Sequence, residues 1–491
     1  MARYVLLILF ILAFSSCNEN FSFIPATPKN KSSSFKQGIY SLDHLFDSGT
    51  TYRVDSLTKD KQDNLYLYGT FNGYLDGVSS EVDDLFVIKL NPQFKTIWKI
   101  HFNSAQPLLN STSMSEVAKT ILWNESDGSI YISAMTKSEI VENNPTASYD
   151  LFYAKISESG VIQWVRHIGN SSSLDSTADE SHGHTRIDQD GNLVVSYETS
   201  GNLYDTNAGG VDIGVLKLDP QNGNIIDAIQ LGTNTLQSWA TPLGLSPLAD
   251  KNEKVTEANF DFDGDKIVLP FRTGSSLLET NPNTSSDIAY VVINKDFTID
   301  TIVHIGQESY DVWKGSNFPS GTINGDNQAR SVIVLGPKDY LFTGKSSLNL
   351  ADVRSTTSSD VFTARFVNHQ LHSLKQFGES VFPNGDLNEE VRHLYKGNNG
   401  YFYIHGHSKS AILGSDSTEL SPFIMQIDES GKFISGLKLQ QSMITNNIVT
   451  LRHENISNEI VVTDQQFILT INHAPTGTAL TKSFLWVLEK F

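Results

Sequence analysis

The sequence predicts an all-β fold, a seven-bladed β-propeller with four antiparallel strands in each blade. Three observations lead to this prediction. One β-rich unit recurs seven times along the chain, each unit holds four short strand patterns with no helical period between them, and the two chain ends carry complementary parts of one unit. A closed ring of repeated antiparallel sheets accounts for all three.

The clearest element of the unit is an acidic residue followed by a β-rich run, with a basic residue at the fifth following position, as in DLFVIKL and DLFYAKI. Successive copies start between 61 and 75 residues apart, which is too regular for unrelated segments. The copies begin at Asp84, Asp150, Asp212, Asp287, Asp360, Ser421 and Lys482.

A turn signal and a second strand pattern precede each copy. These second patterns start at Asp63, Asp127, Asp190, Asp263, Lys338, Asn399 and Asn458. Several open with Asp-Gly or Asn-Gly, which supply the positive φ angles that a tight hairpin needs. Another strand pattern follows each copy and a fourth comes before the hairpin turn, so each unit supplies four strands.

The chain ends distinguish a closed ring from an open solenoid. The seventh unit stops at Phe491, directly after its third strand, and so lacks its outermost strand. A matching pattern, GIYSLDHLF at residues 38–46, stands before the first complete unit. Pairing this N-terminal strand into the last blade leaves no exposed sheet edge. The ring is therefore predicted to span residues 37–491.

The units resemble the SBBP-type β-propeller repeats of bacterial exported proteins, with their Asp-Gly-Asn turn, aromatic strand and Asp-x-Phe-x-x-Lys strand. The resemblance covers nearly all of residues 38–491 and is strongest in the first two units. In the later units Ser421 and Lys482 replace the acid, while Val292, Gln426 and Val487 replace the basic residue. The resemblance implies the propeller fold and an envelope setting, and it brings no shared catalytic residues.

The N-terminus predicts a lipid anchor. Arg3 precedes the ten apolar residues 5–14, and Ser15 and Ser16 lead to Cys17, the chain's only cysteine. Ten apolar residues are too short to span a bilayer, so residues 1–16 resemble a lipoprotein signal peptide that leaves Cys17 as the lipidated first mature residue. Phe14 departs from the usual leucine. Residues 17–36 continue as a polar tether without periodicity.

The net charge of −19 argues against two classes of partner. Nucleic acid and anionic lipid head groups both require a concentrated basic surface. We therefore expect no nucleic acid, and membrane attachment through the lipid anchor alone. The expected location is the outer membrane of the bacterial cell envelope, and the expected partner is a protein or carbohydrate of the envelope or cell surface.

The predicted strand order places all long connections on one face of the propeller. The strand before each hairpin turn is innermost, and the connections from strand two to three and from blade to blade are the long ones. Loops on a rigid scaffold often carry function. The longest connections, residues 232–255 and 306–328, carry four aromatic candidates for binding, Trp239, Tyr310, Trp313 and Phe318. The alternative is that these rings cover the underside of their own loops.

Basic residues near the start of several innermost strands are a second candidate site. A ring of cations at the channel mouth would hold an anion, because arginine offers a fixed fork of donors. The ring would consist of Arg53, Lys119, Arg186, Arg330, Arg392 and Arg452. The alternative is pairing with nearby acids such as Asp55 or Asp188.

Two histidine pairs and one acidic turn are weaker candidates. His182 with His184, and His405 with His407, would each share a strand face, but zinc normally requires three or four ligands. Asp261, Asp263 and Asp265 resemble part of a calcium loop, yet they coincide with the repeated hairpin turn. We therefore assign structural roles to these residues and expect no metal and no cofactor.

Catalysis is the alternative function. The sequence contains no nucleophile elbow, no glycine-rich phosphate loop and no three-ligand metal spacing. Propellers host many functions, so the fold does not distinguish a binding protein from an enzyme. The sequence favours a binding or scaffold module that acts through the long-loop face. A hydrolase or oxidoreductase with its site at the mouth of the central channel stays open.

Overall fold

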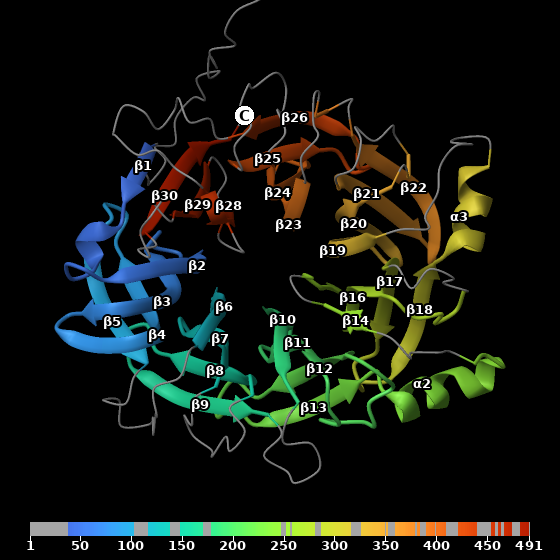
Figure 1. The fold of residues 1–491 in the computed structure, drawn as a ribbon, viewed down its shortest axis with the longest axis horizontal. Coiled ribbons are helices and arrows are strands. Elements are labelled where there is room, and N and C mark those ends of the chain that lie inside the picture. The colour runs from blue at the N-terminus through green and yellow to red at the C-terminus, as the bar shows by residue number, and fades with distance from the viewer. Residues whose placement is uncertain are drawn as a thin grey trace, which may run out of the picture. The chain divides into compact units, whose positions relative to one another are not determined.

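The computed structural model describes residues 38–102, 116–137, 148–169, 178–246, 252–255, 258–279, 286–315, 326–348, 350–351, 359–378, 381–382, 389–397, 399–408, 421–438, 453–456, 460–462, 466–473 and 482–490. All of them belong to one compact unit, residues 34–490. Within this unit seven antiparallel sheets stand around a central axis (Figure 1). The predicted seven-bladed β-propeller is confirmed.

Each blade pairs its strands in chain order from the axis outward. The first three blades are formed by β2 (Thr51–Lys59), β3 (Leu65–Leu75), β4 (Val78–Leu90) and β5 (Thr96–Phe102); β6 (Glu116–Trp123), β7 (Ile130–Thr136), β8 (Asp150–Ile156) and β9 (Ile162–Ile168); and β10 (Glu180–Ile187), β11 (Leu193–Thr199), β12 (Asp212–Leu218) and β13 (Ile225–Gln230).

The next three blades follow the same order, except that two short segments share the innermost place in blade four. They are formed by β14 (Glu253–Lys254), β15 (Asp261–Asp263), β16 (Lys266–Thr273), β17 (Asp287–Ile293) and β18 (Ile299–Ile305); β19 (Asn327–Gly336), β20 (Asp339–Ser346), β21 (Asp360–Val367) and β22 (Gln370–Phe377); and β23 (Glu389–Lys396), β24 (Phe402–Ser408), β25 (Ser421–Ile427) and β26 (Phe433–Lys438).

The seventh blade is closed by the N-terminal strand, as predicted. Its strands are β27 (His453–Ile456), β28 (Val461–Val462), β29 (Gln466–His473), β30 (Lys482–Glu489) and β1 (Gly38–Ser41). β1 pairs antiparallel with β30, so the first described strand covers the edge of the last one. Leu42 and Leu45, which follow β1, pack into a buried cluster shared by blades seven and one. The closing segment is therefore held by hydrophobic contacts as well as by strand pairing.

Two boundaries of the sequence prediction need correction in this blade. The pattern at Asn458 was expected to be the second strand, but its valines form β28, which lies at the axis and pairs with β29. This unit lacks an Asp-Gly or Asn-Gly turn, so alternation alone does not show which strand follows the hairpin. In the N-terminal pattern only β1 is a strand, and η1 (Asp43–Leu45) is a 3-10 turn.

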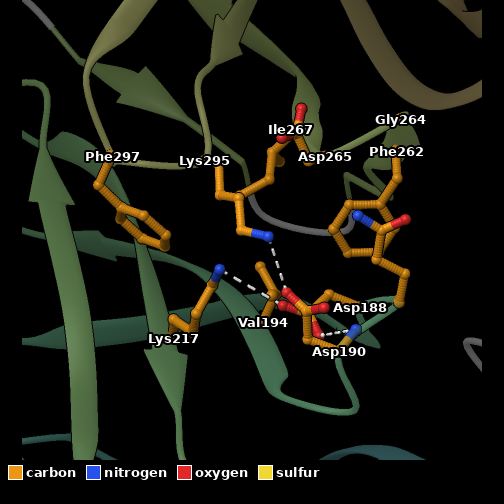
Figure 2. A pocket seen from close by; sticks show the side chains of 11 residues that line it. Asp188, Asp190, Val194, Lys217, Phe262, Gly264, Asp265, Ile267, Lys295 and Phe297 are labelled. Carbon is orange, nitrogen blue, oxygen red and sulfur yellow. Dashed lines mark hydrogen bonds and ion pairs between the residues drawn. The ribbon is translucent and has the colours of Figure 1, made fainter.

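The basic residue of the repeat holds the hairpin between the first two strands of its own blade. Lys89, Lys155, Lys217 and Arg365 pair with carboxylates at or next to that turn, namely Asp60, Asp127, Asp188 and Asp339. Figure 2 shows Lys217 beside Asp188, at a pocket of about 10 Å³ where blades three and four meet. A neighbouring pair joins Lys295 to Asp190, 3.0 Å apart. The three repeat lysines are buried, so this pairing offsets their desolvation.

The acidic residue of the repeat pairs at the opposite end of the blade. Its carboxylate contacts a histidine or glutamine of the outermost strand, in the pairs Asp150–His167, Asp212–Gln230, Asp287–His304 and Asp360–Gln376. The two ends of the motif therefore fasten the third strand of the blade to its neighbours on both faces of the propeller. This local role explains the motif without reference to a ligand.

No helix in the described part of the chain is both long and apolar enough to cross a membrane.

Candidate functional site

The innermost strands surround the central axis of the propeller (Figure 1), and six of them carry a β-bulge at the same height. Bulges bend a strand and re-aim its side chains. We call the residues that the pairing skips the collar. They are Asp55, Lys119, Gly183 with His184, Arg330, Arg392 and Glu454.

In blade four, the backbone of Asn259 contacts β19, the innermost strand of blade five. Its backbone N–H donates to the carbonyl of Arg330 over 2.7 Å, and its carbonyl accepts from Val332 over 3.2 Å. This backbone contact between blades four and five replaces the regular innermost strand that blade four lacks at this height.

The structure distributes the predicted cation ring over three heights. Lys119, Arg330 and Arg392 are collar residues, whereas Arg53 lies two residues before the skipped position of its strand and Arg186 two residues after. Arg452 lies outside the described residues.

Several of these cations face acids. Arg53 Nε lies 2.7 Å from a carboxylate oxygen of Asp55, and Arg330 lies 3.6 Å from Glu390. Burial raises the pKa of Asp55, and the charges of Arg53 and Lys119 oppose that shift. Asp188 pairs with Lys217 rather than with a member of the ring.

A cavity of about 450 Å³ occupies one end of the channel. It lies at the ends of the innermost strands that lead into the short hairpin turns, because residues 57–59 of β2, 121–123 of β6 and 184–187 of β10 line it. Its aliphatic wall consists of Leu57, Ile121, Leu122, Ile187, Ile460 and Val461, and its other lining residues are Thr58, Lys59, Trp123, His184, Thr185, Arg186, Asn259, Phe262, His393 and Tyr395.

Two imidazoles meet in this cavity across the channel. The ring centroids of His184, on β10, and His393, on β23, are 5.3 Å apart, although their strands belong to blades three and six. Burial lowers the pKa of His184 well below its usual value, and the nearby His393 lowers it further. His184 is therefore uncharged at neutral pH and offers one donor and one acceptor.

The structure separates the first of the two predicted histidine pairs, whereas His405 and His407 stand two residues apart on the regularly paired strand β24. The bulge in β10 separates His182 from His184, and an imidazole nitrogen of His182 lies 2.7 Å from the hydroxyl of Thr185. Burial lowers the pKa of His182 to about 3 and that of His405 well below its usual range. No group of three His, Cys, Asp or Glu side chains suited to a metal ion occurs among the described residues.

The acidic turn of blade four contacts its neighbours. Asp261 accepts from Arg186 and from the backbone N–H of Val334, and Asp263 accepts from the hydroxyl of Tyr340. Asp265 is exposed in the turn between β15 and β16. Two of the three carboxylates therefore serve contacts to blades three and five.

Two helices follow the outermost strands of blades three and four on the long-loop face, α2 (Thr233–Ala240) and α3 (Gln307–Lys314). They share a pattern that sequence reasoning missed: a glycine, an apolar residue four positions later and a tryptophan three positions after that. The pattern reads Gly232, Leu236, Trp239 in α2 and Gly306, Tyr310, Trp313 in α3.

The glycines allow close approach of a loop from the same blade. A Cβ at Gly232 would lie 2.4 Å from the carbonyl oxygen of Thr206, and one at Gly306 would lie 2.7 Å from Glu279. Asp205 and Glu279 then accept backbone N–H groups in the first turns of α2 and α3, respectively. Each helix is therefore built into its blade by a carboxylate at its N-terminal end.

The helices turn the predicted aromatic candidates mainly inward. Tyr310 is fully buried and its hydroxyl donates to the carbonyl of Leu350. Trp313 is half-buried against the core between blades four and five, and Trp239 against the core between blades three and four. Phe318 lies outside the described residues.

Exposed aliphatic side chains accompany these helices. Leu243 and Leu245, just after α2, are 58% and 41% exposed, and Val312 on α3 is 86% exposed. An open hollow of about 480 Å³ beside them is lined by Asn234, Gln237, Ser238, Thr241 and Pro242. We call Leu243, Leu245 and this hollow the rim patch. Its described lining carries no charge.

Buried carboxyl groups at the start of the innermost strands were also missed. Each accepts a hydroxyl from the end of the second strand, in the pairs Glu116–Thr136, Glu180–Thr199, Glu253–Thr273 and Glu389–Ser408. Burial is the main cause that raises the pKa of Glu180 to about 9, with Asp150 adding to the shift. Aligning the innermost strands would have revealed this column of glutamates.

Comparison with known proteins finds only distant structural similarity. No family model matches the chain, and no curated protein matches its sequence. Solved structures match over most of its length at 10% identity, beginning with a polysaccharide lyase, Uly1, at a TM-score of 0.46 over 95% of this chain and 94% of that one.

Two other similar structures have different descriptions. A member of the DUF4221 family from Bacteroides vulgatus has a TM-score of 0.39 at 10% identity, covering 93% of this chain and 97% of that one. The propeller domain of the Trilobed protease from Pyrococcus furiosus has a TM-score of 0.42 at 10% identity, covering 90% and 97%. At this similarity they indicate no activity for the present chain.

Proposed function

We propose that this protein is a lipid-anchored binding module of the bacterial cell envelope, and that it binds a protein partner through its long-loop face. The rim patch is the observation that carries this proposal. Leu243 and Leu245 expose aliphatic surface beside neutral hydrogen-bonding groups, which is the composition of a protein-binding surface.

A protein fits the rim patch better than a carbohydrate does. Sugars stack on exposed aromatic faces, whereas Tyr310 is buried and Trp239 and Trp313 are partly covered by the core. The exposed groups are aliphatic, and such side chains gain most from contact with another apolar surface. The experiment described below distinguishes a protein partner from a carbohydrate partner.

The anchor and the location belong to the same proposal. Cys17 lies outside the described residues, and its position after a short apolar segment supports lipidation. Residues 17–36 would act as the tether between that lipid and the propeller. The outer membrane of the cell envelope is the proposed location, and the lipid on Cys17 would attach the protein there.

Catalysis in the channel is the second candidate function. It is favoured by the meeting of His184 and His393 in a cavity, since an uncharged imidazole can accept a proton during hydrolysis or oxidation. Binding is preferred because the described lining of that cavity includes no serine, cysteine or carboxylate, while its Thr185 hydroxyl contacts His182 and its Lys59 pairs with Asp63.

The test is attachment of the purified protein, without residues 1–17, to isolated envelope fractions. Leu243→Asp combined with Leu245→Asp should reduce attachment at least tenfold, because charges would be buried at the contact. The matched control is Ile97→Asp, since Ile97 is 50% exposed at the short-turn end of blade one. Equal attachment of the two variants would contradict the proposal.

Treatment of the envelope fraction identifies the class of partner. Protease should abolish attachment if the partner is a protein, whereas glycosidases should leave it unchanged. The opposite result would replace the protein by a carbohydrate. In cells, Cys17→Ser should move the protein from the membrane to the soluble fraction, and continued membrane fractionation would contradict lipidation.

A further inference from the structure

The channel cavity is lined by two basic side chains, although the chain as a whole is acidic. Its described charged lining residues are Lys59 and Arg186, and no aspartate or glutamate lines it within the described part of the chain. The whole chain has a net charge of −19, so a lining with two basic residues and no carboxylate differs from the average composition of the chain. This cavity lies at the short-turn end of the channel, away from the long-loop face.

Arg186 is held in place with donors to spare. Its Nε donates to the side-chain oxygen of Asn259 over 3.0 Å, and its Nη1 lies 3.3 Å from a carboxylate oxygen of Asp261. These contacts use two of the five N–H donors of a guanidinium. The side chain is still 31% exposed, so a ligand in the cavity can reach it without displacing either partner.

The local charge favours a monoanion. A guanidinium matches the planar geometry of a carboxylate and can bind both of its oxygens. Asp261 contacts the same guanidinium and Asp63 pairs with Lys59 over 2.7 Å. These two acids reduce the positive potential, which disfavours a phosphate dianion more strongly than a singly charged carboxylate.

The remaining wall suits a compact apolar body. Trp123 and Tyr395 supply rings, and Leu122 and Ile187 supply partly exposed aliphatic surface. His184, uncharged at neutral pH, lies at the inner end, with its ring centroid 5.3 Å from that of His393. The volume of about 450 Å³ lies within the usual range of sites for one small molecule, and it is too small for a folded partner.

We propose that the channel cavity binds a small organic carboxylate with a planar or aliphatic body, with the carboxylate group on Arg186 and the body between Trp123 and the aliphatic wall. This site is separate from the rim patch and does not depend on the protein partner proposed there.

The experiment is calorimetric titration of the full-length protein with indole-3-acetate and benzoate, beside their neutral amides. The acids should bind at least tenfold more tightly than the amides, because only they meet the guanidinium with a charge. Binding should also change the fluorescence of Trp123. Inorganic phosphate serves as a third probe and should bind more weakly than either acid.

Variants locate the site. Arg186→Gln should lower the affinity for the acids at least tenfold and remove their preference over the amides. The matched control is Arg53→Gln, because Arg53 is also ion-paired on an innermost strand but does not line the cavity. Thr58→Asp tests the same site without touching Arg186, since a carboxylate at this lining position should repel the acids.

The inference is overturned if no acid shows saturable binding at millimolar concentration, if acids and amides bind equally, or if Arg186→Gln and Thr58→Asp both retain wild-type affinity. Phosphate binding as tightly as the acids would likewise overturn the preference for a carboxylate. Attachment to envelope fractions should be unchanged in Arg186→Gln, so failure at the cavity and failure at the rim patch are distinguishable.

Discussion

The rim patch and the channel cavity are built from the same repeat by different routes. The cavity uses innermost strands that each blade already has, and its chemistry comes from residues such as His184 and Arg186 that differ between blades. The rim patch instead depends on α2, an addition to the long connection of blade three. The cavity lies at one end of the channel and has two basic side chains in its lining, whereas the described lining of the patch carries no charge.

This difference shows where a propeller can change its function. A residue in the channel wall must preserve strand pairing and the packing of two blades, so variation is restricted to side chains. A connection on the long-loop face tolerates a whole helix when a carboxylate such as Asp205 and a glycine such as Gly232 fit it to the blade. A small ligand therefore suits the first region and a macromolecule the second.

Removal of the closing strand should have the largest effect. Deletion of residues 37–47 strips β1 from β30 and removes Leu42 and Leu45 from the core, so stability should fall by several kcal/mol or the protein should aggregate. Ile460 and Val461 of this blade line the cavity. The deletion should therefore disturb the cavity more than it disturbs α2, which follows blade three. Thermal unfolding and size-exclusion chromatography measure the effect.

Deletion of residues 18–34 is the control for closure. This segment is polar and lacks strand periodicity, so its loss should leave the midpoint of thermal unfolding nearly unchanged. Two truncations of equal stability would contradict closure of the ring by β1.

The second prediction separates the buried and exposed sides of α2. Leu236→Ala should lower the free energy of unfolding by about 2–5 kcal/mol, because Leu236 is buried in the core between blades three and four. Leu243→Ala, the matched control, should change it by less than about 0.5 kcal/mol, because Leu243 is exposed. Urea denaturation followed by tryptophan fluorescence measures both. Similar losses would show that the rim patch is part of the core.

The propeller could be predicted because its signal is repeated. The motif begun by Asp150 and the turn at Asp127 recur in several units, so errors in one blade do not affect the ring. The closing strand was predictable for the same reason, since the missing strand of the last unit appeared at residues 38–46. The blade-seven hairpin was misplaced where the Asp-Gly turn was absent.

The sites were less predictable because they depend on register and on long-range contact. A bulge changes which residue of a strand lies at a given height along the channel. Sequence spacing therefore could not show that Arg53 and Arg186 lie at different heights from Arg330. The meeting of His184 with His393 joins positions on opposite sides of the channel. The shared Gly, apolar and Trp pattern of α2 and α3 was visible, but only by comparing two connections with each other.

The third prediction concerns pH at the long-loop end of β10, the strand that carries Arg186 at its other end. Glu180 has a pKa of about 9 in the folded protein, against 4.5 for the ordinary group. The folded state therefore holds this proton more tightly, so its stabilising effect is complete below about pH 4.5 and is lost as pH rises towards 9. Glu180→Gln should weaken this decline and gain stability relative to wild type at pH 9.

The control for this titration is Glu81→Gln, because Glu81 is an exposed residue of β4. Its midpoint of thermal unfolding should follow that of the wild type between pH 5 and 9 within about 2 °C, as expected for a surface substitution. Carboxylate binding in the cavity should be the same in Glu180→Gln and wild type at neutral pH. An unchanged pH profile in Glu180→Gln would show that this carboxyl group is not the one that titrates.

The smallest expected effect compares the two helices directly. Tyr310 in α3 occupies the position of Leu236 in α2, but it adds a hydroxyl that donates to the carbonyl of Leu350. Tyr310→Phe keeps the ring in the core and removes that bond, so the free energy of unfolding should fall by about 1 kcal/mol. Attachment to envelope fractions should not change, because the buried ring offers no surface to a partner. Loss of attachment at unchanged stability would instead show that α3 opens in the complex, and would return Tyr310 to the binding surface.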